Sequence, residues 1–179
     1  MPMMTWESLL NSPQPTAAGT ALNTSTALTD ISVAPQFTLP ANFLQAGSSL
    51  RFTAFGVFST TVTPTLLLGV YYGGVAGVAL AATTAITTGS GVTNVPWRIE
   101  LNTTIRTTGT SGTAMSQGNV MLGTSVSAVT TVPLPQIALA TVTVDTTAAK
   151  TLTIGAQWGT SSASNTITLH GFYVESLGA

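Results

Sequence analysis

The sequence predicts an all-β protein, a jelly-roll or Greek-key β-sandwich with a short N-terminal arm, and three observations support this class. Threonine makes up about one residue in five, and β-branched side chains favour strands over helices. Apolar and polar residues alternate along many short runs, as they do in strands that bury one face. Turn residues separate these runs at intervals typical of sandwiches. The length of 179 residues fits one domain.

The composition predicts a folded chain with an unusually neutral surface. Charged residues make up 5% of the chain and apolar residues 44%, whereas soluble domains usually carry roughly 25% charged residues. The formal net charge is −1 with four basic residues, too few to neutralise a nucleic-acid backbone, so we expect no nucleic-acid partner. The absence of cysteine excludes disulfides and thiolate metal ligands.

Residues 1–15 are predicted to form a docking arm, and residues 16–179 the sandwich domain. Thr5 is suited to cap a short helical turn in which Trp6, Leu9 and Leu10 share one side. A proline-rich stretch then ends the turn. We expect the apolar side of the arm to dock on a neighbouring subunit, and the alternative is that it folds onto its own domain. No basic, apolar secretion signal is visible here.

Residues 50–58 predict a strand with apolar side chains on both faces. One face includes Phe52 and Phe58, and the other includes Phe55 and Val57. Because Phe55 and Val57 would be wasteful on the surface of a lone monomer, their face is predicted to lie deep in the sandwich or against another subunit.

Residues 66–82 are apolar and long enough to raise the alternative of a transmembrane helix. However, Gly73 and Gly74 lie in the middle of the segment, and no Lys or Arg anchors its flanks. A Gly-Gly pair between two apolar runs is typical of a β-hairpin turn. The sequence therefore favours two strands, at 65–72 and 75–86, and no membrane partner.

Residues 95–107 show the clearest alternation in the chain. Odd-numbered side chains such as Ile99 and Leu101 are apolar apart from two threonines, whereas the even-numbered ones are polar from Arg98 onward. This pattern predicts a strand with one buried and one wet face. Pro96 suggests that the strand lies at a sheet edge or contains a bulge.

Further short runs of the same kind predict the remaining strands. They lie around residues 26–33, 36–39, 115–122, 137–144, 152–158 and 166–175. The linkers between them, one of which contains Pro133 and Pro135, are rich in turn residues. No fixed repeat occurs, which disfavours a propeller or solenoid.

The chain offers few groups for catalysis. It has five acidic residues and one histidine, His170, which falls within a predicted strand, where a lone histidine is more often a packing residue. No nucleophile-elbow, P-loop, zinc-protease or dinucleotide motif occurs. A glycosidase would need two carboxyl groups within several ångström, for which Glu100 with Asp145 or Glu175 is available. We expect instead that Glu100 belongs to a ladder of cross-strand pairs, that the protein is not an enzyme, and that it binds no cofactor or metal.

Aromatic residues allow the alternative of a platform on which a sugar ring stacks. Trp97 and Trp158 align with apolar strand faces and are therefore predicted to be core residues, whereas Tyr71, Tyr72 and Tyr173 are left open. The candidate interface residues are Trp6, Leu9, Leu10, Phe55, Val57 and Tyr173.

Three stretches of the chain resemble a known group of proteins. They are residues 14–60, residues 63–81 and the segment LTIGAQWGTSSASNTITLHGFYVE at 152–175. They resemble structural proteins encoded by tailed bacteriophages of actinobacteria. The phrase ITLHGFYVE is also similar to the last strand of trimeric jelly rolls of the tumour-necrosis-factor type.

The resemblance implies a virion protein that is made in the host cytoplasm and binds the major capsid protein or other virion subunits. A capsid decoration or cement protein, forming a homotrimer on the capsid surface, is the leading hypothesis. The alternatives are a tail-fibre or spike module that binds a host-surface glycan, and a spike hydrolase. Independently of the resemblance, a mean hydropathy of +0.45 with so few charges favours burial of surface in a homo-oligomer.

Overall fold

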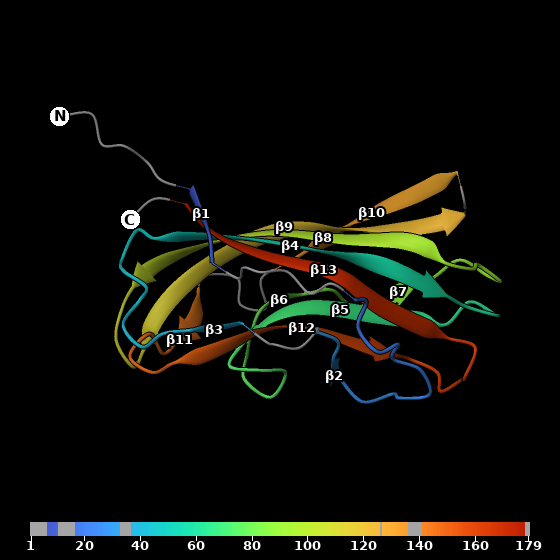
Figure 1. The fold of residues 1–179 in the computed structure, drawn as a ribbon, viewed down its shortest axis with the longest axis horizontal. Coiled ribbons are helices and arrows are strands. Elements are labelled where there is room, and N and C mark those ends of the chain that lie inside the picture. Colours follow the sequence, from blue (N-terminus) through green and yellow to red (C-terminus); the bar gives the residue numbers. More distant parts are fainter. Residues whose placement is uncertain (1–6, 11–16, 33–36, 126, 136–140, 178–179) are drawn as a thin grey trace.

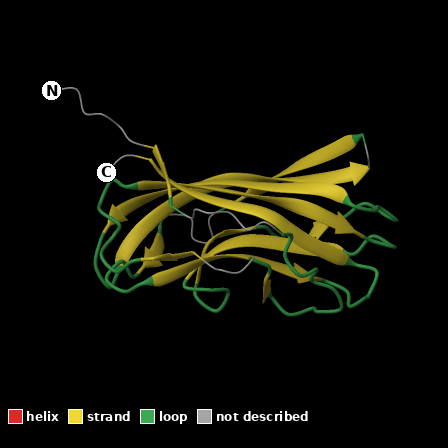
Figure 2. Ribbon diagram, in the orientation of Figure 1, coloured by secondary structure: helices red, strands yellow, loops and turns green. Residues whose placement is uncertain are grey.

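A computed structural model describes residues 7–10, 17–32, 37–125, 127–135 and 141–177, which form a sandwich of two antiparallel sheets (Figure 1). Figure 2 shows strands and loops and no helix in these ranges. The part of the chain that is described therefore contains no helix able to cross a membrane. The all-β sandwich predicted from the sequence is confirmed.

The larger sheet contains the longest strands. Its order is β1 (Glu7–Leu9), β13 (Thr166–Leu177), β4 (Ser49–Ser59), β8 (Val95–Thr107), β9 (Gly112–Ser125) and β10 (Ala128–Leu134), with β11 (Val142–Val144) also paired to β9. The strands predicted at 50–58, 95–107, 115–122 and 166–175 all belong to this sheet, and β8 has the predicted bounds.

The smaller sheet covers one face of the larger one (Figure 1). Its order is β2 (Thr29–Asp30), β12 (Lys150–Trp158), β5 (Thr65–Tyr72) and β6 (Val78–Ala82), with β3 (Phe37–Leu39) paired to β12 and β7 (Ile86–Thr87) paired to β5. The chain leaves the larger sheet after β4, builds β5 to β7 in the smaller sheet, and returns to pair β8 with β4. Such crossing between sheets is typical of Greek-key sandwiches.

The core lies between the sheets and is filled by the inward-facing residues of both. Trp97 on β8 and Trp158 on β12 are 1% and 0% exposed. Each indole N–H donates to a backbone carbonyl, of Thr168 at 3.2 Å and of Leu22 at 3.3 Å respectively, which satisfies the polar atom of a buried tryptophan. Both residues are therefore core residues, as predicted, and neither forms a sugar platform.

The apolar segment 66–82 forms two strands and not a helix. β5 and β6 pair in antiparallel fashion around Gly73 and Gly74, which have φ values of +91° and +79°. Glycine adopts this left-handed backbone without the steric cost that other residues carry. The predicted hairpin is confirmed.

Three local predictions are wrong. Residues 7–9 form strand β1 on the edge of β13 and not a helical turn, because an unpaired strand edge offers hydrogen-bond partners that so short a helix lacks. Strand β8 lies between β4 and β9 and not at an edge, and its register shift falls between Ile105 and Thr107 and not at Pro96. Pro96 pairs with Val57 of β4, and the pairing with β9 begins only at Trp97. The linker expected around Pro133 forms β10, an edge strand in which proline is acceptable.

Candidate functional site

The candidate site is the outer face of the larger sheet, meaning the side chains on β13, β4, β8, β9 and β10 that point away from the core. Strand alternation sends Arg51, Thr53 and Phe55 of β4 to this face, while Phe52 and Ala54 point into the core. The register then builds rows across the sheet. One row runs Leu9, Glu175, Arg51, Asn102 and Gln117, and the next runs Tyr173, Thr53, Glu100 and Asn119.

Two ion pairs lie on the outer face, and together they carry no net charge. The Arg51 guanidinium lies 3.4 Å from the Glu175 carboxylate across β4 and β13. Arg98 and Glu100 are separated by one residue on β8, and the Arg98 Nη2 atom lies 2.5 Å from the Glu100 Oε1 atom. The four side chains are between 28% and 49% exposed, so each pair contributes little to folding. Around these pairs the face offers hydrogen-bond donors and acceptors, and the charge of Arg51 and Arg98 is balanced within the chain.

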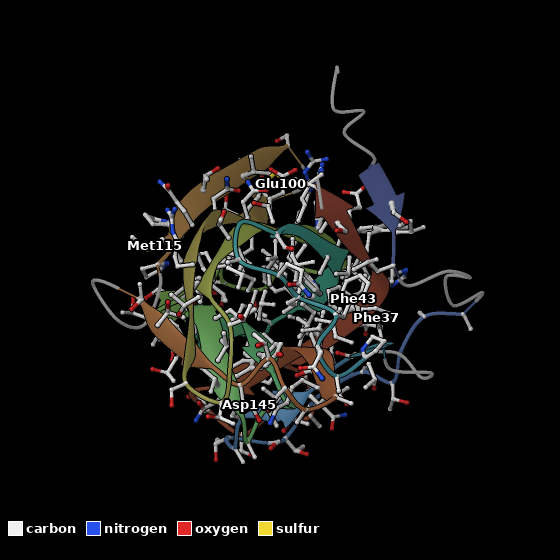
Figure 3. All side chains as sticks on the ribbon, turned by 90° about the vertical axis from the view of Figure 1, so that its left-hand side faces the viewer. Phe37, Phe43, Glu100, Met115 and Asp145 are labelled. Atoms are coloured by element: carbon white, nitrogen blue, oxygen red, sulfur yellow. The ribbon has the colours of Figure 1, made fainter. Side chains whose placement is uncertain are left out.

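A shallow hollow of about 370 Å³ lies between the two ion pairs. It is lined mainly by polar side chains, which are Arg51, Thr53, Arg98, Glu100, Asn102 and Glu175. Figure 3 shows Glu100 on the outside of the larger sheet. The volume is near the lower end of ligand pockets, but such pockets are usually mostly apolar.

An aromatic pair lies on the same strands as the hollow. The rings of Phe55 and Tyr173 stack with centroids 5.9 Å apart and an interplanar angle of 22°. Phe55 is 36% exposed, whereas Tyr173 is half-buried. A Cβ at Gly171, which lies opposite Phe55, would come within 2.6 Å of the Phe55 ring. Glycine at this position therefore lets the phenyl ring lie on the sheet.

The structure places most of the predicted interface residues on this face. Phe55, Val57 and Tyr173 belong to it, and Val57 is half-buried. Leu9 lies opposite Glu175, so it joins the outer face and is 42% exposed. Trp6 lies outside the described residues.

Leu10 behaves differently from Leu9. Its N–H donates to the Val174 carbonyl at 2.7 Å, and its side chain packs against the core cluster. The helical turn would have placed both leucines on one side, whereas a strand sends successive side chains to opposite faces. Leu10 therefore supports its own domain.

Two exposed apolar residues of the outer face were not among the candidates. Met115 on β9 and Val129 on β10 are 39% and 54% exposed, and Figure 3 shows Met115 on the outside of the sheet. Alternation along each strand shows which residues of that strand share a face with Met115 or Val129. The sequence does not reveal the register between strands, so it could not show that Met115 lies opposite Thr104.

The possible catalytic groups are spread over the molecule. Glu100 and Glu175 line the same hollow, each beside an arginine, while Asp145 lies on the opposite side in Figure 3 and pairs with Lys150 at 3.5 Å. Hydrogen bonds from the Thr147 hydroxyl and N–H lower the pKa of Asp145. His170 is exposed at an irregularity of β13. Within the described ranges, no three His, Cys, Asp or Glu residues gather as metal ligands.

The open tyrosines differ in position. Tyr71 and Tyr72 are each 5% exposed, and the Tyr72 hydroxyl donates to the Asp145 carbonyl at 2.9 Å. Tyr173 is the one of the three that lies on the outer face.

No protein-family model matches the chain, and searches of curated proteins and of solved structures found no match. The chemistry of the outer face and the sequence resemblance are therefore the two supports for a functional proposal.

Proposed function

We propose that this chain is a virion structural protein of a tailed bacteriophage, a capsid decoration or cement protein that binds neighbouring virion subunits through the outer face of its larger sheet. The virion setting comes from the sequence resemblance. One observation supports the outer face as the binding surface. The Phe55–Tyr173 stack lies there beside Arg51 and Arg98, and each arginine is paired with a glutamate of the same chain.

The residue types of this face suit a protein interface. Aromatic residues, methionine and arginine are enriched in interfaces, and the outer face carries all three kinds. Phe55 and Tyr173 form a rigid pair that loses little conformational freedom on binding, and aromatic anchors of this kind dominate binding energy. Leu9 and Met115 add exposed apolar side chains at two other places on the face. Because the ion pairs are satisfied within the chain, a partner need not supply compensating charges.

Binding of this kind stabilises the assembled head by mass action. A protein that binds the assembled state and not its separated subunits stabilises that state by RT ln(1 + [L]/Kd) at each site. Many equivalent sites on a lattice add their contributions, so moderate affinity at each site is sufficient.

The test is cosedimentation of the purified protein with phage heads that lack it. The double variant Phe55→Gln, Tyr173→Gln should bind at least about tenfold more weakly, since each lost anchor costs about 1–2 kcal/mol or more. Val62→Gln is the matched control, because Val62 is 57% exposed but lies on the loop after β4. Equal binding by the double variant, or no binding of the unchanged protein to heads, would overturn the proposal.

One observation favours a second function, the binding of a host-surface glycan by a tail-fibre or spike module. The hollow brings together carboxylate, guanidinium and amide groups beside an aromatic stack. Sugar hydroxyl groups pair with such planar polar groups, and sugar C–H faces pack on aromatic rings. Titration with bacterial cell-surface glycans, followed by NMR, tests this function. Binding that Asn102→Ala weakens, together with no affinity for heads, would favour it over the decoration role.

A further inference from the structure

We propose that two copies of this chain join edge to edge through β10, in antiparallel pairing about a two-fold axis perpendicular to the larger sheet. One continuous sheet would then run through both copies. The pairing itself does not depend on the proposed function, and only its consequence for docking rests on that proposal.

The two edges of the larger sheet differ in how they are covered. Along β13, residues 7–9 pair with residues 175–177, and the N–H groups of Gly19 and Leu22 donate to the carbonyls of Leu169 and Ile167, each at 2.9 Å. At the opposite edge, β10 pairs with β9, and the described residues provide no strand paired to its other side. Only past its C-terminal end is this side closed, where the N–H of Ala82 on β6 donates to the Pro135 carbonyl at 3.2 Å. In Figure 1 the end of the β9–β10 hairpin projects from the body of the sandwich.

Strand β10 has only part of the protection that natural edge strands carry. Such strands are very short, carry lysine or other charges, contain proline or a bulge, or are covered. β10 contains Pro133 and a register shift between Ala128 and Val129, and its register is regular from Val129 to Leu134. β10 has seven residues, AVTTVPL, none of which is charged. Most of the strand is exposed, and Val129 is 54% exposed. An uncharged, exposed edge of this length is a surface for strand addition.

The position of Pro133 shows which backbone groups face the free edge. Pro133 lies opposite Asn119 of β9 and has no N–H to donate to that strand. Its nitrogen therefore points to the free edge, where the missing donor breaks no bond of the β9–β10 ladder. Because these directions alternate along a strand, the N–H and C=O groups of Thr131 and Val129 also point to the free edge.

A two-fold axis at Thr131 uses these groups well. Thr131 of each copy then exchanges both backbone hydrogen bonds with Thr131 of the other, and the Val129 N–H donates to the Pro133 carbonyl of the other copy. Because Pro133 has no N–H, the hydrogen bond to the Val129 carbonyl of the other copy is missing, once in each copy. A weak edge pairing tolerates this loss. On the outer face the pairing sets threonine against threonine and valine against proline, so it brings no like charges together.

A second copy is the partner that this edge fits, because the strand pairs with itself without any complementary charge from another protein. This pairing closes at two subunits, in contrast to the three-fold closure that the resemblance implies. The axis is perpendicular to the sheet, so the outer faces of both copies point the same way. If the outer face docks on a lattice, the dimer docks through two sites, which raises the effective affinity by about 10²–10⁴.

The experiment measures the mass of the full chain by sedimentation and light scattering from about 1 to about 200 µM, the range expected for a small interface. The unchanged protein should shift from monomer to dimer. Thr131→Lys and Thr131→Glu should each weaken association at least about tenfold, because they set like charges across the axis. Mixing the two variants in equal amounts should restore a dimer, since the facing charges are then opposite.

Thr143→Lys is the matched control, because Thr143 is an exposed threonine on β11, outside β10. It should dimerise like the unchanged protein, and so should the Phe55→Gln, Tyr173→Gln variant, which separates failure of dimerisation from failure of head binding. Thr131 is exposed, so its variants should keep the thermal unfolding midpoint. A protein that stays monomeric throughout, a trimer, or a dimer unaffected by either Thr131 variant would overturn the proposal.

Discussion

Gly171 shows how a single residue shapes the outer face. It lies opposite Phe55, at a point where any Cβ would meet the Phe55 ring. The ring therefore rests on the strand and stacks on Tyr173, although a glycine inside a strand weakens that strand locally. The exposed aromatic surface thus depends on a residue that has no side chain.

Residues of β8 allow a direct test of its two faces. Ile99 is 0% exposed and points into the core, whereas Thr104 lies on the outer face and bonds the Ser49 hydroxyl at 3.0 Å. Ile99→Ala should lower the free energy of unfolding by about 2–5 kcal/mol, the usual cost of a buried large-to-small change. Thr104→Ala should cost about 1 kcal/mol or less. Urea unfolding measures both, and equal losses would contradict the face assignment.

Tyr72 makes the stability of the fold sensitive to alkaline pH. Burial, with the nearby charge of Asp145, raises the pKa of Tyr72 from 10.0 to about 12. The unfolded chain therefore releases this proton at lower pH than the folded chain does, so the free energy of unfolding falls as pH rises from about 10 to about 12. Below that window the contribution of Tyr72 is constant.

Tyr72→Phe should reduce this alkaline loss, while costing about 1 kcal/mol near neutral pH through the lost hydrogen bond to Asp145. Burial also raises the pKa of Tyr71, so part of the pH dependence should remain. Urea unfolding at about pH 8 and about pH 11 measures the difference. An unchanged dependence in the Phe variant would show that Tyr72 is not its source.

At the scale of elements, the last residue of β1 and the residue that follows the strand have different roles. Leu9 points to the outer face and Leu10 to the core cluster. Leu9→Ser should leave the unfolding midpoint nearly unchanged and weaken attachment to heads, whereas Leu10→Ser should lower the free energy of unfolding by about 1–2 kcal/mol. Calorimetry and cosedimentation together measure both effects. A large loss of stability in the Leu9 variant would mean that β1 serves the domain alone.

The whole molecule should assemble in a way that is insensitive to salt. Charged residues are 5% of the chain, Arg51 and Arg98 on the outer face are already paired, and β10 carries no charge. Little Coulomb attraction is therefore available for salt to screen, even at about 1 M, where the Debye length is about 3 Å. Dimer formation and head binding should persist from about 0.05 to about 1 M NaCl. Release of the protein from heads at high salt would show that electrostatic contacts dominate.

The sequence by itself determined the fold class, most strands and the inward or outward direction of residues on β4 and β8. Each of these depends on local alternation and on turn residues, which are properties of neighbouring positions. The same local pattern correctly put Phe55 and Val57 on the strand face opposite to Phe52 and Phe58, and both tryptophans in the core. It left open whether the face of Phe55 and Val57 lies inside the sandwich or outside it, and the structure places that face outside.

Only the tertiary structure decided which strands lie side by side. Residues 7–9 are strand because β13 offers them an edge, and the hollow exists because β4, β8 and β13 are neighbours that align Arg51, Glu100 and Glu175. The free edge at β10 is likewise a property of strand order. Register and strand order arise from contacts between residues far apart in the chain, and local periodicity contains no information about them.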